Sequence, residues 1–154
     1  MKEKDLLLVT ALRKDCRQPI VTLSCALQVC RATVTERLEE LQKTIIQKYT
    51  ALLDFKQLGY QVKLLVGVKL PEYEKEIFSK YIQQHGCVNN LYKGEKGVDY
   101  VVEMVFKTKE EADQFLVSLE HAFCIEQKQV FFIERDVLRE IFFDRKQKVL
   151  RQGV

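Results

Sequence analysis

TLSCALQVCRATVTERLEELQK, residues 22–43, is the stretch of sequence that decides the fold. Apolar residues recur in it at helical spacing in two groups, which are Leu23, Ala26 and Leu27, and then Val34, Leu38 and Leu41. Each group predicts a short helix with one apolar face, and Val29 interrupts the rhythm between them. Two such helices joined by a turn of about four residues are typical of a helix-turn-helix, whose second helix enters the major groove of DNA.

The second predicted helix leaves the face opposite its apolar stripe available to a partner. That face carries Arg31, Ala32, Thr35, Glu36 and Glu39. Three cations and three glutamates balance along this helix, namely Arg31, Arg37, Lys43, Glu36, Glu39 and Glu40. A duplex is a dense row of phosphates, so a neutral helix gains little from charge and the attraction has to come from elsewhere. The candidate sources are Lys2, Lys4, Arg13, Lys14, Arg17 and Lys48. Two short amphipathic helices also occur in many all-helical domains, which keeps that alternative open.

The composition is that of an ordinary soluble protein of one or two domains. Of 154 residues, 47% are hydrophobic and 31% charged, which excludes a disordered chain. The net charge of +3 permits a nucleic-acid partner without requiring one. Residues 1–5 are too charged for a signal peptide, and no apolar run is long enough to cross a bilayer. We therefore expect a cytoplasmic protein with no membrane partner.

The sequence shows no pattern of a metal site or an enzyme. Its five cysteines include no C-x-x-C motif, and their odd number argues against a disulfide framework. There is no phosphate-cradling glycine loop, no nucleophile elbow and no two-histidine metal helix. We expect a protein that is not an enzyme and has no cofactor and no metal.

The rest of the chain predicts an α+β architecture with two domains. A helix over residues 5–14, with Asp5 as its N-cap, completes a three-helix, winged-type DNA-binding head over residues 1–46. Residues 47–59 predict a strand connector. The boundary lies near Gly59, where the composition changes.

Residues 60–143 predict strands and helices in the order βαββαβ, the ferredoxin-like arrangement. The expected strands cover residues 61–70, 87–93, 98–107 and 127–134, with a further strand over 137–143. The helices begin near Glu72 and at Thr108, where Glu111 completes a capping box. Residues 144–154 form a basic tail that is either a short helix or frayed.

This plan resembles the Lrp/AsnC (feast/famine) family of transcription regulators over nearly the whole chain. The residues that carry the likeness are Asp5, Leu8, Val9, Leu12, Asp15 and Arg17, the pair Leu23-Ser24, the runs 33–41 (TVTERLEEL) and 49–54 (YTALLD), the pair Leu58-Gly59, and Gly97-Val98-Asp99-Tyr100. The chain departs from the family where Gln28, Val29 and Cys30 replace its usual Gly-Leu-Ser turn.

The resemblance implies an oligomeric DNA-binding regulator. In that family the ferredoxin-like sheets pair into dimers, which assemble into tetramers or octamers, and amino acids bind where dimers meet. A dimer with two recognition helices is expected to prefer a palindromic double-stranded operator.

The expected site residues fall into two sets. The DNA-binding set is Thr22, Arg31, Ala32, Thr33, Thr35, Glu36 and Arg37, with Arg31, Thr33 and Thr35 near base edges and phosphates. Arg37 is either a phosphate contact or the intrahelical partner of Glu36 or Glu40. The effector set is Gly97, Asp99 and Tyr100, in which Asp99 either meets the amino group of an effector or serves turn formation.

Two alternative functions remain at this stage. Sirohaem decarboxylases resemble the same architecture and tend to carry histidines near the second strand of the ferredoxin-like half, where this chain offers only His85. The alternative for His85 is a solvated histidine at a helix end. The other possibility is a regulator-like oligomer that has lost specific DNA binding, which the neutral recognition helix and the altered turn favour.

Overall fold

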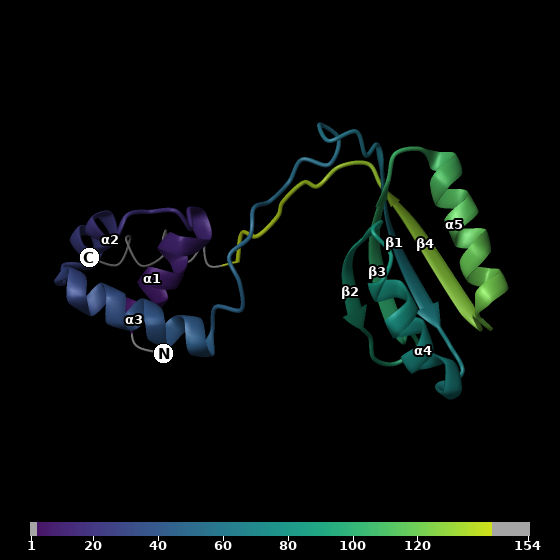
Figure 1. Ribbon diagram of the computed structural model, residues 1–154, viewed down its shortest axis with the longest axis horizontal. Helices are drawn as coiled ribbons and strands as arrows, with labels where there is room; N and C mark the ends of the chain where they lie inside the picture. Colours follow the sequence, from purple (N-terminus) through teal and green to yellow (C-terminus); the bar gives the residue numbers. More distant parts are fainter. Residues whose placement is uncertain (1–2, 143–154) are drawn as a thin grey trace. The chain divides into compact units, whose positions relative to one another are not determined.

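The computed structural model describes residues 3–142, which divide into two compact units (Figure 1). Within the described residues, the first unit, called the head below, comprises residues 3–52 together with residues 137–142, and the second, the sheet domain, comprises Leu53–Asp136. The division at Leu52 falls inside the predicted connector. The return of the chain to the head after Asp136 was not expected from the sequence.

Three helices build the head: α1 (Glu3–Lys14), α2 (Ile20–Leu27) and α3 (Arg31–Thr44). Leu8, Leu23 and Val34, one from each helix, are at most 1% exposed and form the centre of a small apolar core. Leu23 and Leu27 of the first predicted stripe and all three residues of the second face this core, so the predicted helix-turn-helix is confirmed. Ala26, which the sequence placed on the first stripe, is exposed. Asp5 lies inside α1, so its prediction as the N-cap is wrong.

The sheet domain contains β1 (Val62–Lys69), α4 (Glu72–Gln83), β2 (Val88–Lys93), β3 (Tyr100–Phe106), α5 (Lys109–Ala122) and β4 (Gln127–Ile133). The strands pair in the order β2-β3-β1-β4, all antiparallel. This is the βαββαβ order that the sequence predicts, and the ferredoxin-like fold is confirmed.

Both helices of the sheet domain cover the same face of the sheet. Alternate residues of the central strands, including Leu64, Val66, Val102 and Met104, are at most 1% exposed. They form one cluster with side chains of α4 and α5, namely Phe78, Ile82, Ala112, Leu116 and Leu119. Because side chains alternate along a strand, the intervening residues lie on the other face, called the open face below.

The predicted capping box at the start of α5 is present with a small change. Oγ1 of Thr108 accepts a hydrogen bond from the Glu111 backbone N–H at 3.2 Å. The Glu111 carboxylate reaches back to the N–H of Lys107, at 3.1 Å, one residue before the cap.

Two of the predicted strands do not form. Residues 47–59, the predicted connector, and residues 137–142 after β4 have neither helical nor strand structure. An extended segment becomes a strand only where a neighbouring backbone forms hydrogen bonds with it. The prediction of these two strands rested on their apolar sequence alone, which does not provide such a neighbour. Phe143 and the basic tail over 144–154 lie outside the described residues.

Candidate nucleic-acid interface

The turn before α3 places two unusual residues at helix ends. Gln28, the C-cap of α2, has a left-handed backbone with φ of 51°, a conformation that disfavours residues other than glycine. Cys30, the N-cap of α3, makes no capping hydrogen bond, and its Sγ lies 3.1 Å from Oγ1 of Thr33. The hydrogen bond with the Thr33 hydroxyl lowers the pKa of the Cys30 thiol. Both helix ends are therefore weaker than with glycine and serine there.

Helix α3 presents a polar face on the side away from the core. Val34 and Leu41 are 0% and 5% exposed and dock the helix on the head. Five of the predicted DNA-facing or partner-facing residues are exposed on the opposite side, which are Arg31, Ala32, Thr35, Glu36 and Glu39. Thr33 is half-buried at the first turn. The surface expected from the sequence is present, and its contact with DNA stays a prediction.

Arg37 does not lie on that exposed face. Its Nη1 forms an ion pair with Oδ1 of Asp5 in α1, with the two side chains 21% and 17% exposed. Its Nε is buried and has no hydrogen-bond partner. The structure therefore pairs Arg37 with Asp5 and not with Glu36 or Glu40, and its contact with a phosphate stays a prediction. Its guanidinium joins α3 to α1 instead.

Thr22 lies in the first turn of α2 and is exposed. The N–H groups of a first helical turn have no partners within the helix and are suited to bind phosphate oxygens. Pro19 is the N-cap residue and makes no capping bond. The first helix of a helix-turn-helix crosses the DNA backbone, and the contact of Thr22 with that backbone stays a prediction.

The two units differ in the sign of their charge. Residues 1–52 contain nine Lys and Arg against six Asp and Glu, whereas residues 53–136 contain eleven against fourteen. Residues 1–52 are therefore formally +3 and the sheet domain −3. Because α3 itself is neutral, we expect the attraction of the head to phosphates to come from its other cations, as the sequence suggests.

The proposed effector residues sit in a turn with internal bonds. Oδ2 of Asp99 accepts the backbone N–H of Leu70 at 2.8 Å, and its Oδ1 lies 2.8 Å from Nζ of Lys75. Lys75 and this N–H lower the pKa of the Asp99 carboxyl. Gly97 has φ of 100°, and Tyr100 is 8% exposed and packs on Phe78 in the core. In the structure Asp99 therefore serves the turn, and an effector role stays a prediction.

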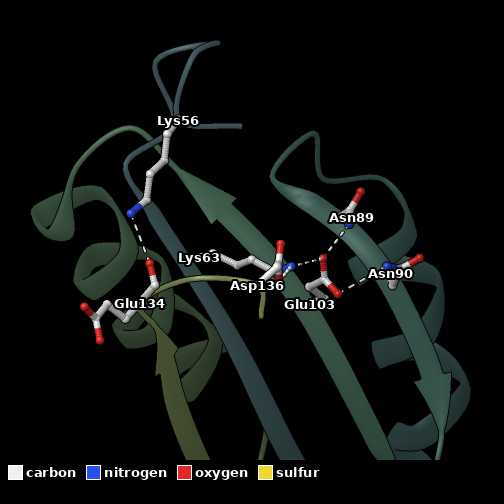
Figure 2. Close-up of polar contacts among 7 residues, drawn as sticks. All are labelled: Lys56, Lys63, Asn89, Asn90, Glu103, Glu134 and Asp136. Carbon is white, nitrogen blue, oxygen red and sulfur yellow. Dashed lines mark hydrogen bonds and ion pairs between the residues drawn. The ribbon is translucent and has the colours of Figure 1, made fainter. Parts of the chain in front are cut away.

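A polar cluster that the sequence analysis did not predict lies on the open face of the sheet (Figure 2). Nζ of Lys63 on β1 lies 3.2 Å from Glu103 on β3 and 2.8 Å from Asp136 after β4. Glu103 also accepts hydrogen bonds from the side-chain amides of Asn89 at 2.5 Å and Asn90 at 3.3 Å. Partial burial raises the pKa of Glu103, but these amides and Lys63 outweigh it and lower the pKa below its ordinary value.

No family model matches the chain. HTH-type transcriptional regulator FL11 of Pyrococcus furiosus is 30% identical to it over 115 residues, which cover 73% of this chain and 75% of the relative. The chain belongs to the Lrp/AsnC family of DNA-binding transcriptional regulators. LrpC of Bacillus subtilis is 27% identical over 113 residues, covering 73% of this chain and 78% of LrpC.

Solved structures of Lrp/AsnC regulators share the fold. B. subtilis LrpC matches with a TM-score of 0.80 and 24% identity, over 90% of this chain and 97% of that one. E. coli AsnC matches with a TM-score of 0.79 and 17% identity, over 90% and 95% of the two chains. The transcriptional regulator NMB0573 of Neisseria meningitidis, solved in complex with L-Met, matches with a TM-score of 0.82 and 17% identity, over 90% and 93%.

His85, the residue that suggested an enzyme of the same architecture, packs against aromatic rings. The ring of His85 lies 4.4 Å from that of Tyr81 and 5.0 Å from that of Phe115, between centroids. It is half-buried, so it is not the fully solvated helix-end histidine that was the alternative. Among residues 3–142 no group of three His, Cys, Asp or Glu is placed to hold a metal ion, and no helix in that range is long and apolar enough to cross a membrane. Relatives of the Lrp/AsnC family are transcriptional regulators.

Proposed function

We propose that the chain is a cytoplasmic, oligomeric transcription regulator that reads double-stranded DNA with the exposed face of α3. The observation that carries this proposal is the arrangement of α3, whose apolar side is buried in the head while Arg31, Ala32, Thr35 and Glu36 are exposed. Thr33 at the first turn of α3 and Thr22 at the start of α2 complete the DNA-contacting set. We leave Arg37 out of the DNA-contacting residues that the sequence suggested, because its charge is paired with Asp5.

The open face of the sheet supports dimer formation by this protein. Phe131 and Tyr92 are 55% and 52% exposed on it, because Phe131 pairs with Leu65 and Tyr92 with Val101. An apolar face without helices marks an association surface. The polar cluster on this face is already paired within one chain, so a second copy covers it without leaving an unpaired charge. Such dimers assemble further into tetramers or octamers.

A dimer sets the form of the operator. A two-fold axis relates its two recognition helices, so the half-sites form an imperfect palindrome with centres about 10 bp or a multiple of it apart.

A small molecule such as an amino acid is proposed as the effector, near Gly97, Asp99 and Tyr100. The complex of the Neisseria meningitidis relative with L-Met supports this class of ligand. The ammonium group of an amino acid would have to displace Lys75 from Asp99, since that carboxylate is already paired.

Selection of bound fragments from a random duplex library, followed by footprinting, tests the proposed function. The expected result is a common palindromic site protected over two half-sites. If no fragment binds better than random DNA at low salt, the protein is an oligomer without specific DNA binding. The three glutamates of α3, Glu36, Glu39 and Glu40, make that second candidate worth testing.

A further inference from the structure

The side of α3 that faces away from the core carries a single line of side chains. Val34 and Leu41, which are 0% and 5% exposed, give the direction of the core. With about 3.6 residues per turn, the side chains within roughly 30° of the opposite direction are those of Ala32, Glu36, Glu39 and Lys43. All four are exposed. These residues, called the outer line below, are the part of α3 that lies deepest in a groove when the helix enters one.

Glu36 is the acidic residue of the outer line that lies nearest to the start of the helix. It is the sixth of the 14 residues of α3. In a helix-turn-helix, the N-terminal residues of the recognition helix contact base edges. Ala32, four residues earlier on the outer line, has the smallest side chain there and does not hold the helix away from the bases. Glu36 therefore lies at a position from which a side chain of a recognition helix reaches base edges.

No cation of α3 neutralises the Glu36 carboxylate. Side chains three or four residues apart are neighbours on a helix, and those positions around Glu36 hold Ala32, Thr33, Glu39 and Glu40. The next residue, Arg37, is paired with Asp5 of α1. A free carboxylate is repelled by the phosphates of a duplex, so Glu36 lowers the affinity for DNA unless a group of the DNA binds it.

The major groove offers few groups that can bind a carboxylate. An ionised carboxylate only accepts hydrogen bonds, and the donors on base edges in this groove are the N4 amino group of cytosine and the N6 amino group of adenine. Adenine also presents its N7 acceptor, guanine presents N7 and O6, and thymine presents O4. Cytosine is the base whose own edge presents a donor and no acceptor, so it is the base that a carboxylate prefers.

We propose that Glu36 is a specificity-determining residue of the DNA interface, whose carboxylate accepts a hydrogen bond from the N4 amino group of a cytosine in each half-site. This inference rests on the proposed function, because α3 has to lie in the major groove. It assigns a role to a negative charge that the net charge of α3 alone makes unfavourable. Repulsion from phosphates weakens binding to every duplex, and the bond to cytosine offsets it at the correct site, which increases discrimination.

Selection from a random duplex library with the full chain tests the inference. The wild type should select a cytosine at one position of each half-site. Replacing that C·G pair by T·A exchanges the amino donor for a carbonyl acceptor and should lower the affinity about 5- to 150-fold. In Glu36→Gln the side-chain amide can bind N6 and N7 of adenine, so the preferred base at this position should change from cytosine to adenine.

The matched control is Glu40→Gln, which makes the same change of charge in the second half of α3, at an exposed residue. Both variants should bind random DNA more tightly than the wild type, because each removes a negative charge. Only Glu36→Gln should change the preferred base. If Glu36→Gln keeps the wild-type preference at every position, or if Glu40→Gln changes the preference in the same way, the inference is overturned while the proposed function stands. A wild type that prefers no fragment over random DNA overturns both.

A second variant separates the loss of the cytosine bond from the gain of an adenine bond. Glu36→Ala has no side-chain acceptor and should lose the preference for cytosine without acquiring one for adenine. Alanine is the best helix former and the position is exposed, so thermal unfolding of the head should show that the variant is folded. A folded Glu36→Ala that still selects cytosine at this position overturns the inference.

Discussion

The partly buried ion pair between Asp5 and Arg37 gives Arg37 a structural role, joining α3 to α1, that the sequence of α3 alone does not reveal. Sequence reasoning found neighbours for Arg37 only within α3, because Glu36 and Glu40 are close along the chain. Its partner is 32 residues earlier, in α1, and only the packing of the two helices brings them together. The predicted apolar stripe of α3 was correct, but it did not specify which polar residues border the contact with α1.

Arg37→Ala is expected to destabilise the head by about 1–3 kcal/mol, since it removes a partly buried, charge-assisted hydrogen bond to Asp5. Denaturant unfolding followed in the head measures this. The double variant Asp5→Asn with Arg37→Ala should cost less than the sum of the two single changes. The slope of DNA affinity against salt should hardly change. A slope lower by about one unit, with stability intact, would restore Arg37 as a phosphate contact.

Asp99 provides a prediction about pH. Its pKa is lowered in the folded protein by Lys75 and the Leu70 N–H, so its contribution to stability is present above the pKa of the unfolded chain and is lost as the pH falls through the folded value. NMR titration should give Asp99 a pKa below the ordinary value of an aspartate. Asp99→Asn should reduce the loss of sheet-domain stability on acidification, and Asp113→Asn, at an exposed position of α5, is the matched control. An Asp99 pKa at the ordinary aspartate value would contradict the turn bonds described here.

At the scale of elements, the periodicity of apolar residues predicted the helices and strands that bury an apolar face. It predicted wrongly where a strand would have needed a neighbouring backbone to pair with. The helices and the four strands each bury a stripe that is visible in the sequence, such as Val34 and Leu41 in α3. Residues 137–142 are rich in apolar side chains but do not form a strand, and Val137 and Phe142 are 76% and 67% exposed. A segment forms a strand only where a neighbouring strand is available to pair with it. The local sequence of the segment does not tell how far that neighbouring strand extends.

The docking of α3 gives a prediction at this scale. Leu41→Ala should destabilise the head by about 2–5 kcal/mol, the usual cost of truncating a buried leucine. Leu38→Ala should cost less, because Leu38 is only partly buried. The sheet domain has a separate apolar core and should keep its unfolding transition in both variants. Loss of the sheet transition in step with the head would mean that the two units unfold as one.

The turn between α2 and α3 offers a stabilising change. Gln28→Gly should raise the stability of the head by up to about 1 kcal/mol, because glycine adopts the left-handed C-cap conformation without steric cost. The control Gln42→Gly, inside α3 and exposed, should lower it by about 1 kcal/mol. Thermal or denaturant unfolding of the head distinguishes them, and a destabilised Gln28→Gly would contradict the conformation assigned to Gln28.

For the whole molecule, the open face of the sheet determines assembly. Phe131 and Phe132 are neighbours on β4 with nearly equal exposure, 55% and 51%. Phe131 lies on the open face opposite Leu65, whereas Phe132 lies opposite Leu64 on the helix-covered face. Phe131→Asp should therefore lower the mass measured by light scattering toward that of a monomer, and Phe132→Asp should not. Dissociation by both variants, or by neither, would show that another surface joins the copies.

The measurement that tests the central claim most directly is the affinity of wild type and Arg31→Ala for a selected fragment and for its single-base variants, at one salt concentration. If the exposed face of α3 reads the bases, Arg31→Ala should lose about 1–3 kcal/mol of discrimination at one position in each half-site. The control Arg135→Ala, an exposed cation of the sheet domain, should keep full discrimination. Unchanged discrimination in Arg31→Ala, with affinity for every sequence lowered alike, would contradict the reading of bases by Arg31.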